Sequence, residues 1–412
     1  MLNIKYIKVM KKVYIVAAKR TAIGKFLGSV ANFTPGDLGA VVIKSLMEET
    51  GIKPEQVDEV IGGNVLSGGQ FQGVIRQASI KAGIPAEVPA YGINMVCGSG
   101  MKAVMNGYND ILVGDADIVI AGGTEVMSNA GFILGGNLRS GAKMGDLQAV
   151  DHMVCDGLTD AFNKYHMGIT AENIAEKYGI TREEQDEFGF ASQQKAIKAV
   201  DSGVFAKEIV PVEIVTRKET IIFKDDEYPN RTSTPERMAK LRPAFKKDGT
   251  VTAGNASGIN DGASFVMLMS EEKMKELGLT PMVEIVAAGQ GGVDPSVMGL
   301  GPVPAIRSVL KKAGKKLQDM ELIELNEAFA AQSLGVIREL IKEHGVTKEW
   351  IDERTNINGG AIALGHPIGA SGNRIIVTLI HEMLASGKKL GLASLCIGGG
   401  MGTAIILRNC TK

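Results

Sequence analysis

The chain of 412 residues is 45% hydrophobic and 22% charged, which is typical of a folded globular protein and excludes a mainly disordered one. Its net charge of −1 offers no basic surface to nucleic acid or to an anionic membrane, so we expect neither as a partner. No apolar run approaches the roughly 18 residues of a membrane span. Residues 1–20 are broken by lysines and leave only residues 13–18 apolar, which is too short for a signal peptide.

The four cysteines stand at positions 97, 155, 396 and 410, without a CxxC motif or a cysteine–histidine cluster of zinc spacing. We therefore expect reduced thiols, no metal site and a cytoplasmic location. Glycine is enriched, at 52 of 412 residues, whereas its usual share is about 7%. Because glycine permits tight turns and a close approach of the backbone to a ligand, the sequence predicts many of both.

Apolar segments that predict strands alternate with helical patterns along the chain, which is typical of an α/β protein. In chain order, the expected elements are a strand at residues 13–18, a helix at 38–49, a strand at 117–121, helices at 171–178 and 183–200, a helix at 305–313 and a strand at 392–396.

The two ends of the chain carry the same residue types at similar spacing and in the same order, which predicts an internal repeat. The matched pairs are Ile43 with Ile306, Ser45 with Ser308, Gly51 with Gly314, Asn64 with Asn326, Ser99 with Ser371, and Gly122 with Gly398. We therefore expect two copies of one α/β half.

A polar, turn-rich stretch between the copies has no counterpart in the second one, and we interpret it as an insertion with a solvated charged face. The expected units are an N-terminal half (residues 1–124 and 250–275), an inserted loop domain (125–249) and a C-terminal half (276–412).

Cys97 stands between a short apolar segment and a helical run, in Asn94-Met-Val-Cys97-Gly-Ser-Gly. The dipole of a helix favours the thiolate form of a cysteine at its N-terminus, and the small residues that follow admit a ligand. The alternative is a small buried hydrophobic residue. Gly98-x-Gly100-x-x-Ala103 also fits a degenerate dinucleotide fingerprint, which we reject because no acidic residue is well placed about 20 positions further on.

His366 lies in a glycine-rich stretch, Gly365-His366-Pro367-Ile-Gly-Ala-Ser-Gly372, which predicts a stiff, bent loop. The chain has only five histidines, and this one has the surroundings of a ligand site. The alternatives are a histidine satisfied by local turn bonds, or a phosphate-binding loop that lacks the Gly-Lys-Ser/Thr of a P-loop.

Two more candidate groups follow predicted strands. Cys396 precedes three glycines, whose free N–H groups suit a developing oxyanion. Asn326, in Asn326-Glu-Ala-Phe-Ala330, suits positioning or water binding, or alternatively the capping of a helix. Since ligands bind at strand ends in α/β sheets, cysteine with histidine there predicts nucleophilic acyl chemistry, and a second cysteine predicts a second proton transfer.

Together, the motifs around Cys97, Asn326, His366 and Cys396 resemble the thiolase family, and within it the biosynthetic acetyl-CoA acetyltransferases. The resemblance extends from about residue 11 to residue 408. It implies a duplicated fold of layered α/β/α/β/α halves with an inserted loop domain, in agreement with the repeat. It also implies an acyltransferase that condenses two acetyl-CoA reversibly to acetoacetyl-CoA and CoA, uses no cofactor, and forms a homotetramer, a dimer of dimers.

The resemblance also implies a role for each matching residue. Cys97 is the expected nucleophile, His366 the base that activates it, and Cys396 the base that takes the α-proton of the second acetyl-CoA. One oxyanion hole is expected from His366 and a water held by Asn326, and the other from the N–H groups of Cys97 and Gly398. The residues expected to bind coenzyme A or to line the acyl pocket are His166, Met167, Arg231, Phe245, Ala253, Ser257, Met298, Ala328 and Phe329.

Arg231 is expected near the coenzyme A phosphates, because related sequences tend to carry a basic residue where this chain has Asn230. Rival functions stay open at this point. A decarboxylating ketoacyl synthase pairs its cysteine with two histidines, or with histidine and asparagine, and needs no second cysteine. A non-catalytic acyl-CoA carrier would have lost Cys97 or His366, and a dehydrogenase is supported only by the weak glycine fingerprint.

Overall fold

A computed structural model describes residues 11–411 of the chain. The expected first strand and helix are present as β1 (Val13–Thr21) and α1 (Pro35–Thr50). α1 begins at a capping box between Thr34 and Asp37 and ends at Gly51, whose φ of 69° lies in the left-handed region that favours glycine. The other elements of this half are β2 (Gly24–Lys25), β3 (Glu59–Gly63), α2 (Val74–Lys81), β4 (Ala90–Ile93), α3 (Ser99–Val113), β5 (Ile118–Val126), β11 (Asn260–Ser270) and α7 (Glu271–Glu276).

The second half has the same plan as the first. Its elements are β12 (Val283–Gly292), α8 (Pro302–Ala313), β13 (Leu322–Leu325), α9 (Ala330–His344), α10 (Lys348–Asp352), α11 (Ala361–Leu364), α12 (Ile368–Ser386), β14 (Leu390–Ile397) and β15 (Met401–Asn409). The strand order β3-β5-β11-β1 of the first half returns as β13-β14-β15-β12, and the copies meet where β1 pairs with β12. The expected duplication is therefore confirmed.

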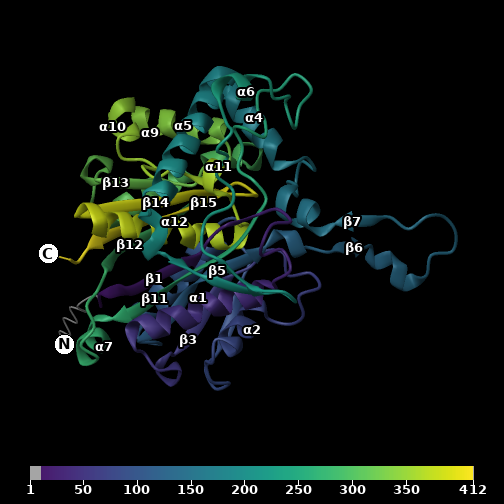
Figure 1. Cartoon of the computed structure of the whole chain (residues 1–412). Coiled ribbons are helices and arrows are strands. Elements are labelled where there is room, and N and C mark those ends of the chain that lie inside the picture. Colours follow the sequence, from purple (N-terminus) through teal and green to yellow (C-terminus); the bar gives the residue numbers. More distant parts are fainter. Residues whose placement is uncertain (1–10, 412) are drawn as a thin grey trace, which may run out of the picture.

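Three hydrophobic clusters correspond to three layers of helices around the strands (Figure 1). α1 and α2 pack on the outer face of the N-terminal strands. α3 and α12 lie together between the two sets of strands. α8 and α9 cover the outer face of the C-terminal strands. The layers thus alternate α/β/α/β/α, as expected.

α3 and α12 cross in the middle layer, where each helix has a glycine. A Cβ on Gly100 would lie 3.0 Å from the backbone N of Asn373, and a Cβ on Gly372 would lie 2.6 Å from the backbone N of Met101. Because the two contacts are reciprocal, residues 97–101 and 369–373 are equivalent in the two halves, in agreement with the match of Ser99 to Ser371.

The match of Gly122 with Gly398 is wrong. In the N-terminal half Gly63 pairs with Gly123, whereas at the same place in the C-terminal half Leu325 pairs with Ser394. Gly398 therefore lies beyond the strand residue that is equivalent to Gly122. A pair of glycines is too common in this chain to set the register of a strand.

Residues 127–259 lie between β5 and β11, and residues 209–210 within them pair with β1 of the main sheet. Their elements are β6 (Phe132–Leu134), β7 (Ala149–Asp151), α4 (Met167–Tyr178), α5 (Arg182–Asp201), β8 (Ile209–Val210), β9 (Val212–Val215), β10 (Thr220–Phe223) and α6 (Pro235–Ala239). Arg20 of β1 anchors this segment, since its guanidinium donates to Asp226 at 2.7 and 3.0 Å and to Glu208 at 2.6 Å. The unit boundaries at 124, 249 and 275 stay predictions.

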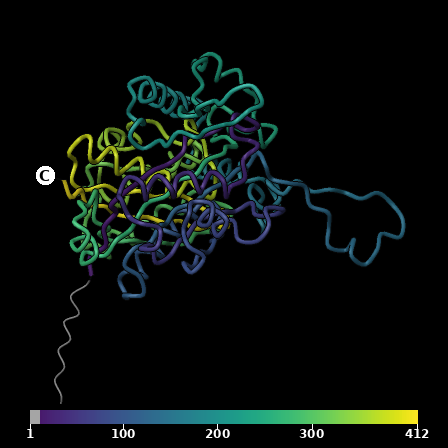
Figure 2. The backbone as a smooth tube through the Cα atoms, turned by 60° about the horizontal axis from the view of Figure 1, so that its bottom comes forward, coloured from purple at the N-terminus to yellow at the C-terminus, as the bar shows by residue number. Residues whose placement is uncertain are grey.

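β6 and β7 form a two-stranded arm that projects from the body of the molecule (Figures 1 and 2). Its apolar side chains lie in the open, with Phe132 71% and Met144 99% exposed.

Within residues 11–411, no helix combines the length and the apolar composition needed to cross a bilayer. The apolar run 13–18, judged too short for a signal peptide, lies in β1, and residues 1–10 lie outside the described residues.

Candidate active site

One cavity of about 400 Å³ opens between the two halves and the inserted segment. The expected site residues on its wall are Cys97, His166, Met167, Phe245, Ala253, Ser257, Met298, Ala328, Phe329, His366 and Cys396. The fold thus brings together four motifs that are far apart in the sequence.

Cys97 is held in a tight turn just before α3, whose N-cap is Gly98. The Ser99 hydroxyl accepts from Met95 N at 2.9 Å and donates to Val96 O at 2.6 Å, and Val96 takes a φ of 46°. A Cβ on Gly98 would lie 2.2 Å from Cδ1 of Ile397, so a larger residue here would require the Ile397 side chain of β14 to shift.

The thiolate expected at Cys97 is not favoured in this structure. Burial raises the pKa of Cys97 to about 11, although the backbone N–H groups of Gly398 and of Cys97 itself lower it. The helix terminus is therefore outweighed by desolvation. Both N–H groups nonetheless face the sulfur, where the second oxyanion hole is expected.

His366 lies between α11 and α12 and is 6% exposed, with its ring on the cavity wall. Ser371 places the ring: the hydroxyl donates to Pro367 O at 2.8 Å and lies 2.6 Å from Nδ1 of His366. Since a hydroxyl has one hydrogen, Nδ1–H must be the donor to Ser371, which leaves a lone pair on Nε2. Nε2 is buried without a partner among the described residues.

Burial, assisted by the positive charge of Arg374, lowers the pKa of His366 to about 3. The imidazole is therefore neutral near pH 7 and free to accept a proton at Nε2. The interpretation of His366 as satisfied by its local turn holds for Nδ1 alone.

Replacing Ser371 by alanine should lower kcat about tenfold and leave KM within about twofold, because the imidazole loses its orientation and its fixed tautomer. Steady-state thiolysis kinetics measure both constants. Ser386→Ala, at the exposed far end of α12, is the matched control. An unchanged kcat in Ser371→Ala would show that the loop alone holds the ring.

Cys396 is the penultimate residue of β14 and is fully buried. Its pKa is raised far above that of an ordinary thiol, chiefly by burial and further by charge on the neighbouring Cys97. The strand ends in a turn at Gly399 and Gly400, whose φ values of 83° and 85° require glycine. A thiol of such high pKa gives a strongly basic thiolate.

Asn326 follows β13 and is 1% exposed, and neither amide atom has a protein partner among the described residues. The alternative that it caps a helix is wrong, because α9 begins only at Ala330 and Phe329 occupies its N-cap position. An unpartnered amide is consistent with the expected water-binding role, which stays a prediction.

Aromatic side chains form the far wall of the cavity. The rings of His166 and Phe245 stack at 4.5 Å, and Phe245 meets Phe329 edge-on at 6.1 Å. His166 also caps α4, where its Nδ1 accepts from Gly168 N at 3.0 Å. Met298 is 3% exposed and closes the same wall.

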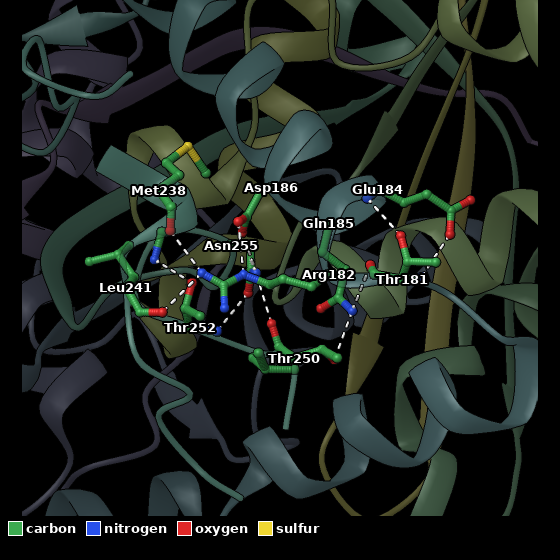
Figure 3. A network of polar contacts seen from close by, with 12 residues as sticks. Thr181, Arg182, Glu184, Gln185, Asp186, Met238, Leu241, Thr250, Thr252 and Asn255 are labelled. Atoms are coloured by element: carbon green, nitrogen blue, oxygen red, sulfur yellow. Dashed lines mark hydrogen bonds and ion pairs between the residues drawn. The ribbon is translucent and has the colours of Figure 1, made fainter. Parts of the chain in front are cut away.

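The loop with Ala253 and Ser257 is held by the first turns of α5 (Figure 3). Asn255 donates to Asp186 at 2.8 Å, and its Oδ1 accepts from Thr252 N at 2.8 Å. Gln185 donates to Thr250 Oγ1 at 2.9 Å. The inserted segment therefore fixes the loop on which coenzyme A contacts are expected.

Arg231 is not on the cavity wall. It forms a two-pronged ion pair with Asp201 at 2.6 and 3.0 Å, and both side chains are 55% exposed. Its contact with the coenzyme A phosphates stays a prediction.

The sequence interpretation missed part of the site. The overlooked wall residues are Phe26, Val96, Met127, Gly157, Leu158, Tyr228, Ala244 and Ile368. Most are apolar residues from separate loops, and no local pattern distinguishes such residues from the core. The role of Ser371 had a signal, since a serine in the first turn of the helix that follows a loop histidine lies close enough to bond its ring.

The chain resembles known proteins over nearly its whole length. A family model described as "Thiolase, N-terminal domain" matches residues 13–272, and "Thiolase, C-terminal domain" matches residues 279–409. A protein named acetyl-CoA acetyltransferase from Syntrophomonas wolfei is 57% identical over 96% of this chain and 99% of its own length. One of the same name from Pseudomonas aeruginosa is 56% identical over 97% of this chain and 99% of its own.

Solved structures agree with these matches. The acetyl-CoA acetyltransferase of Syntrophomonas wolfei superposes with a TM-score of 0.93 at 44% identity, over 97% of this chain and 100% of the other. Human mitochondrial 3-ketoacyl-CoA thiolase superposes with a TM-score of 0.92 at 45% identity, over 97% and 99%.

Proposed function

The chain belongs to the thiolase family, and we propose that it is an acetyl-CoA C-acetyltransferase, which condenses two acetyl-CoA reversibly to acetoacetyl-CoA and CoA. The observation that carries the proposal is the meeting of Cys97, His366 and Cys396 on one cavity. Two thiols and one neutral imidazole are what a double proton transfer around a thioester needs.

In the first half-reaction, Nε2 of His366 takes the proton of Cys97, and the sulfur attacks the thioester carbon of acetyl-CoA. The bond to the coenzyme A sulfur breaks, and the departing thiolate takes the proton of Cys396. Acetyl-Cys97, a protonated His366 and the thiolate of Cys396 remain. The N–H groups of Cys97 and Gly398 stabilise the tetrahedral oxyanion.

In the second half-reaction, the Cys396 thiolate removes an α-proton from another acetyl-CoA, and the enolate carbon attacks acetyl-Cys97. The sulfur of Cys97 leaves and recovers its proton from His366, so that every group returns to its starting state. The enolate oxygen is stabilised by Nε2–H of His366 and by a water on Asn326. Such donors contribute on the order of 3 kcal/mol each.

Incubation with acetoacetyl-CoA and free CoA tests the function directly, because thiolysis removes the absorbance of the enolate. Turnover supports an acetyltransferase. A decarboxylating ketoacyl synthase or a non-catalytic carrier gives none, and formation of acetyl-Cys97 detected by intact mass separates the ketoacyl synthase from the carrier. Absence of both signals in folded protein would contradict the proposal.

The acyl pocket is short, so acetoacetyl-CoA should be cleaved with a kcat/KM at least about tenfold above that of a long-chain 3-ketoacyl-CoA. Phe245, Met298 and Phe329 close its wall, and each methylene left unburied forfeits about 0.8 kcal/mol. Rates on chains of increasing length measure the preference. Met298→Ala should raise the relative rate on longer chains, and equal efficiency of the unaltered enzyme on a long chain would refute the short pocket.

We further propose a homotetramer, a dimer of dimers, in the cytoplasm. The β6–β7 arm supports assembly, since exposed apolar side chains on a projecting ribbon are costly unless another surface covers them. The four cysteines, all free, are in keeping with a reducing compartment. The substrates proposed are acetyl-CoA, acetoacetyl-CoA and CoA.

A further inference from the structure

Glu125 is a fully buried carboxylate that the mechanism above does not use. It lies at the end of β5 and accepts four hydrogen bonds: Oε1 from Asn64 Nδ2 at 2.8 Å and Leu66 N at 3.1 Å, and Oε2 from Val65 N at 2.9 Å and Gly369 N at 3.0 Å. The first three groups belong to the loop after β3. The fourth, Gly369, lies in the first turn of α12, three residues after His366.

Glu125 and Gly369 are packed so closely that a side chain at position 369 would collide with the carboxylate. A Cβ on Gly369 would lie 2.5 Å from Oε2 of Glu125. Cβ atoms on Gly63 and Gly123 would lie 2.5 and 2.1 Å from the carbonyl oxygen of Gly369. Gly369, in the first turn of α12, therefore approaches the backbone at the ends of β3 and β5 closely, and the carboxylate of Glu125 joins this turn to those strands.

The repeat gives this contact a counterpart. Gly123 of β5 is equivalent to Ser394 of β14, so Glu125, two residues on, occupies the place of Cys396. The crossing of α3 and α12 makes Gly369 equivalent to Cys97. The contact of Glu125 with Gly369 thus corresponds to the approach of Cys396 to Cys97, and both contacts cross between the two halves.

A negative charge on Glu125 acts on the N-terminus of α12 and on Cys97. Its carboxylate faces the N-terminus of α12, where the helix dipole favours a negative charge. Burial raises the pKa of Glu125 to about 7, four hydrogen-bonded partners notwithstanding, and the charge of Asp261 on the adjacent β11 adds to this rise. Negative charge on Glu125 in turn contributes to the raised pKa of Cys97.

We propose that Glu125 is a positioning residue, which ties the first turn of α12, and with it His366, to the half that carries Cys97. The proposal rests on the proposed function, since it concerns the alignment of the base with the nucleophile. A misplacement of reacting groups by about 1 Å costs on the order of 10²-fold in rate. The residues expected to bind coenzyme A around His166 and Ser257 lie on other segments, so substrate binding should be unaffected.

Glu125→Gln keeps the shape but turns an amide NH₂ toward two N–H donors, so the contact with Gly369 or with the β3 loop is lost. We expect kcat for thiolysis to fall at least about tenfold, with KM for acetoacetyl-CoA and CoA within about threefold. Val119→Ala is the matched control, because it loosens the buried face of the same strand without touching the contact. Val119→Ala should keep kcat within about threefold of the wild type, even where its melting temperature falls as far as that of Glu125→Gln.

Asn64→Ala is the milder variant, which removes one donor to Glu125 and should lower kcat about threefold to tenfold at unchanged KM. It decides the matter where Glu125→Gln does not fold. The proposal is overturned by a wild-type kcat in either variant, or by an equal loss of kcat in Val119→Ala at equal melting temperature. Absence of turnover and of acetyl-Cys97 in the folded wild type would instead refute the acetyltransferase function on which it rests.

Discussion

Replacing Cys97 by serine should lower thiolysis and condensation at least about 10³-fold while the fold is retained. The sulfur is the expected carrier of the acetyl group, and His366, neutral at Nε2, activates a thiol far more easily than a hydroxyl of much higher pKa. Loss of a nucleophile leaves only what substrate binding and the oxyanion donors supply. The turn around residue 97 accommodates serine, because the two side chains differ by one atom.

Labelling, combined with the kinetics, tests whether Cys97 carries the acetyl group. After incubation with labelled acetyl-CoA, peptide mapping should place the label on Cys97 in the unaltered enzyme and nowhere in Cys97→Ser. Cys155→Ser is the matched control, since Cys155 is exposed and should leave the rate unchanged. Label on Cys396 or Cys155 alone would contradict the assignment.

Replacing Cys396 by alanine should lower condensation and thiolysis at least about 10³-fold and yet leave Cys97 able to accept an acetyl group. Removal of the α-proton loses its base, because the proposed mechanism leaves His366 protonated once Cys97 carries the acetyl group, whereas a coenzyme A thiolate is a good leaving group even without a proton donor. Burial makes the Cys396 thiolate a strong base, as the weakly acidic α-carbon requires. The two half-reactions should therefore separate in this variant.

Two measurements show the separation at Cys396. Intact mass should reveal acetyl-Cys97 in Cys396→Ala, and exchange of the acetyl-CoA methyl protons with deuterated water should be lost. Cys396→Ser, which nearly restores the volume lost in Cys396→Ala, should give the same two results. A serine hydroxyl is too weak an acid to form the alkoxide that would act as the base. Retained proton exchange in either variant would show that another group removes the α-proton.

The α/β class, the duplication and the chemistry-bearing residues followed from local sequence. Strands, helix caps and glycine-rich loops depend on neighbours in the chain, as the capping box at Thr34 and the positive φ of Gly51 illustrate. The motif residues of Cys97, His366 and Cys396 were recognisable for the same reason. The register of the repeat at Gly122 was not, because it depends on which strand lies alongside.

The tertiary structure alone decided how these residues behave. The helix terminus beside Cys97 predicts an easy thiolate, yet burial raises its pKa to about 11, since desolvation depends on atoms from both halves of the fold. The lone pair on Nε2 of His366 follows from the two hydrogen bonds of Ser371, to Pro367 O and to Nδ1. Glu125 joins a group 244 positions away, at Gly369. Sequence determines which groups are available, but burial and long-range contacts are sums over the whole fold, and these set charge, tautomer and alignment.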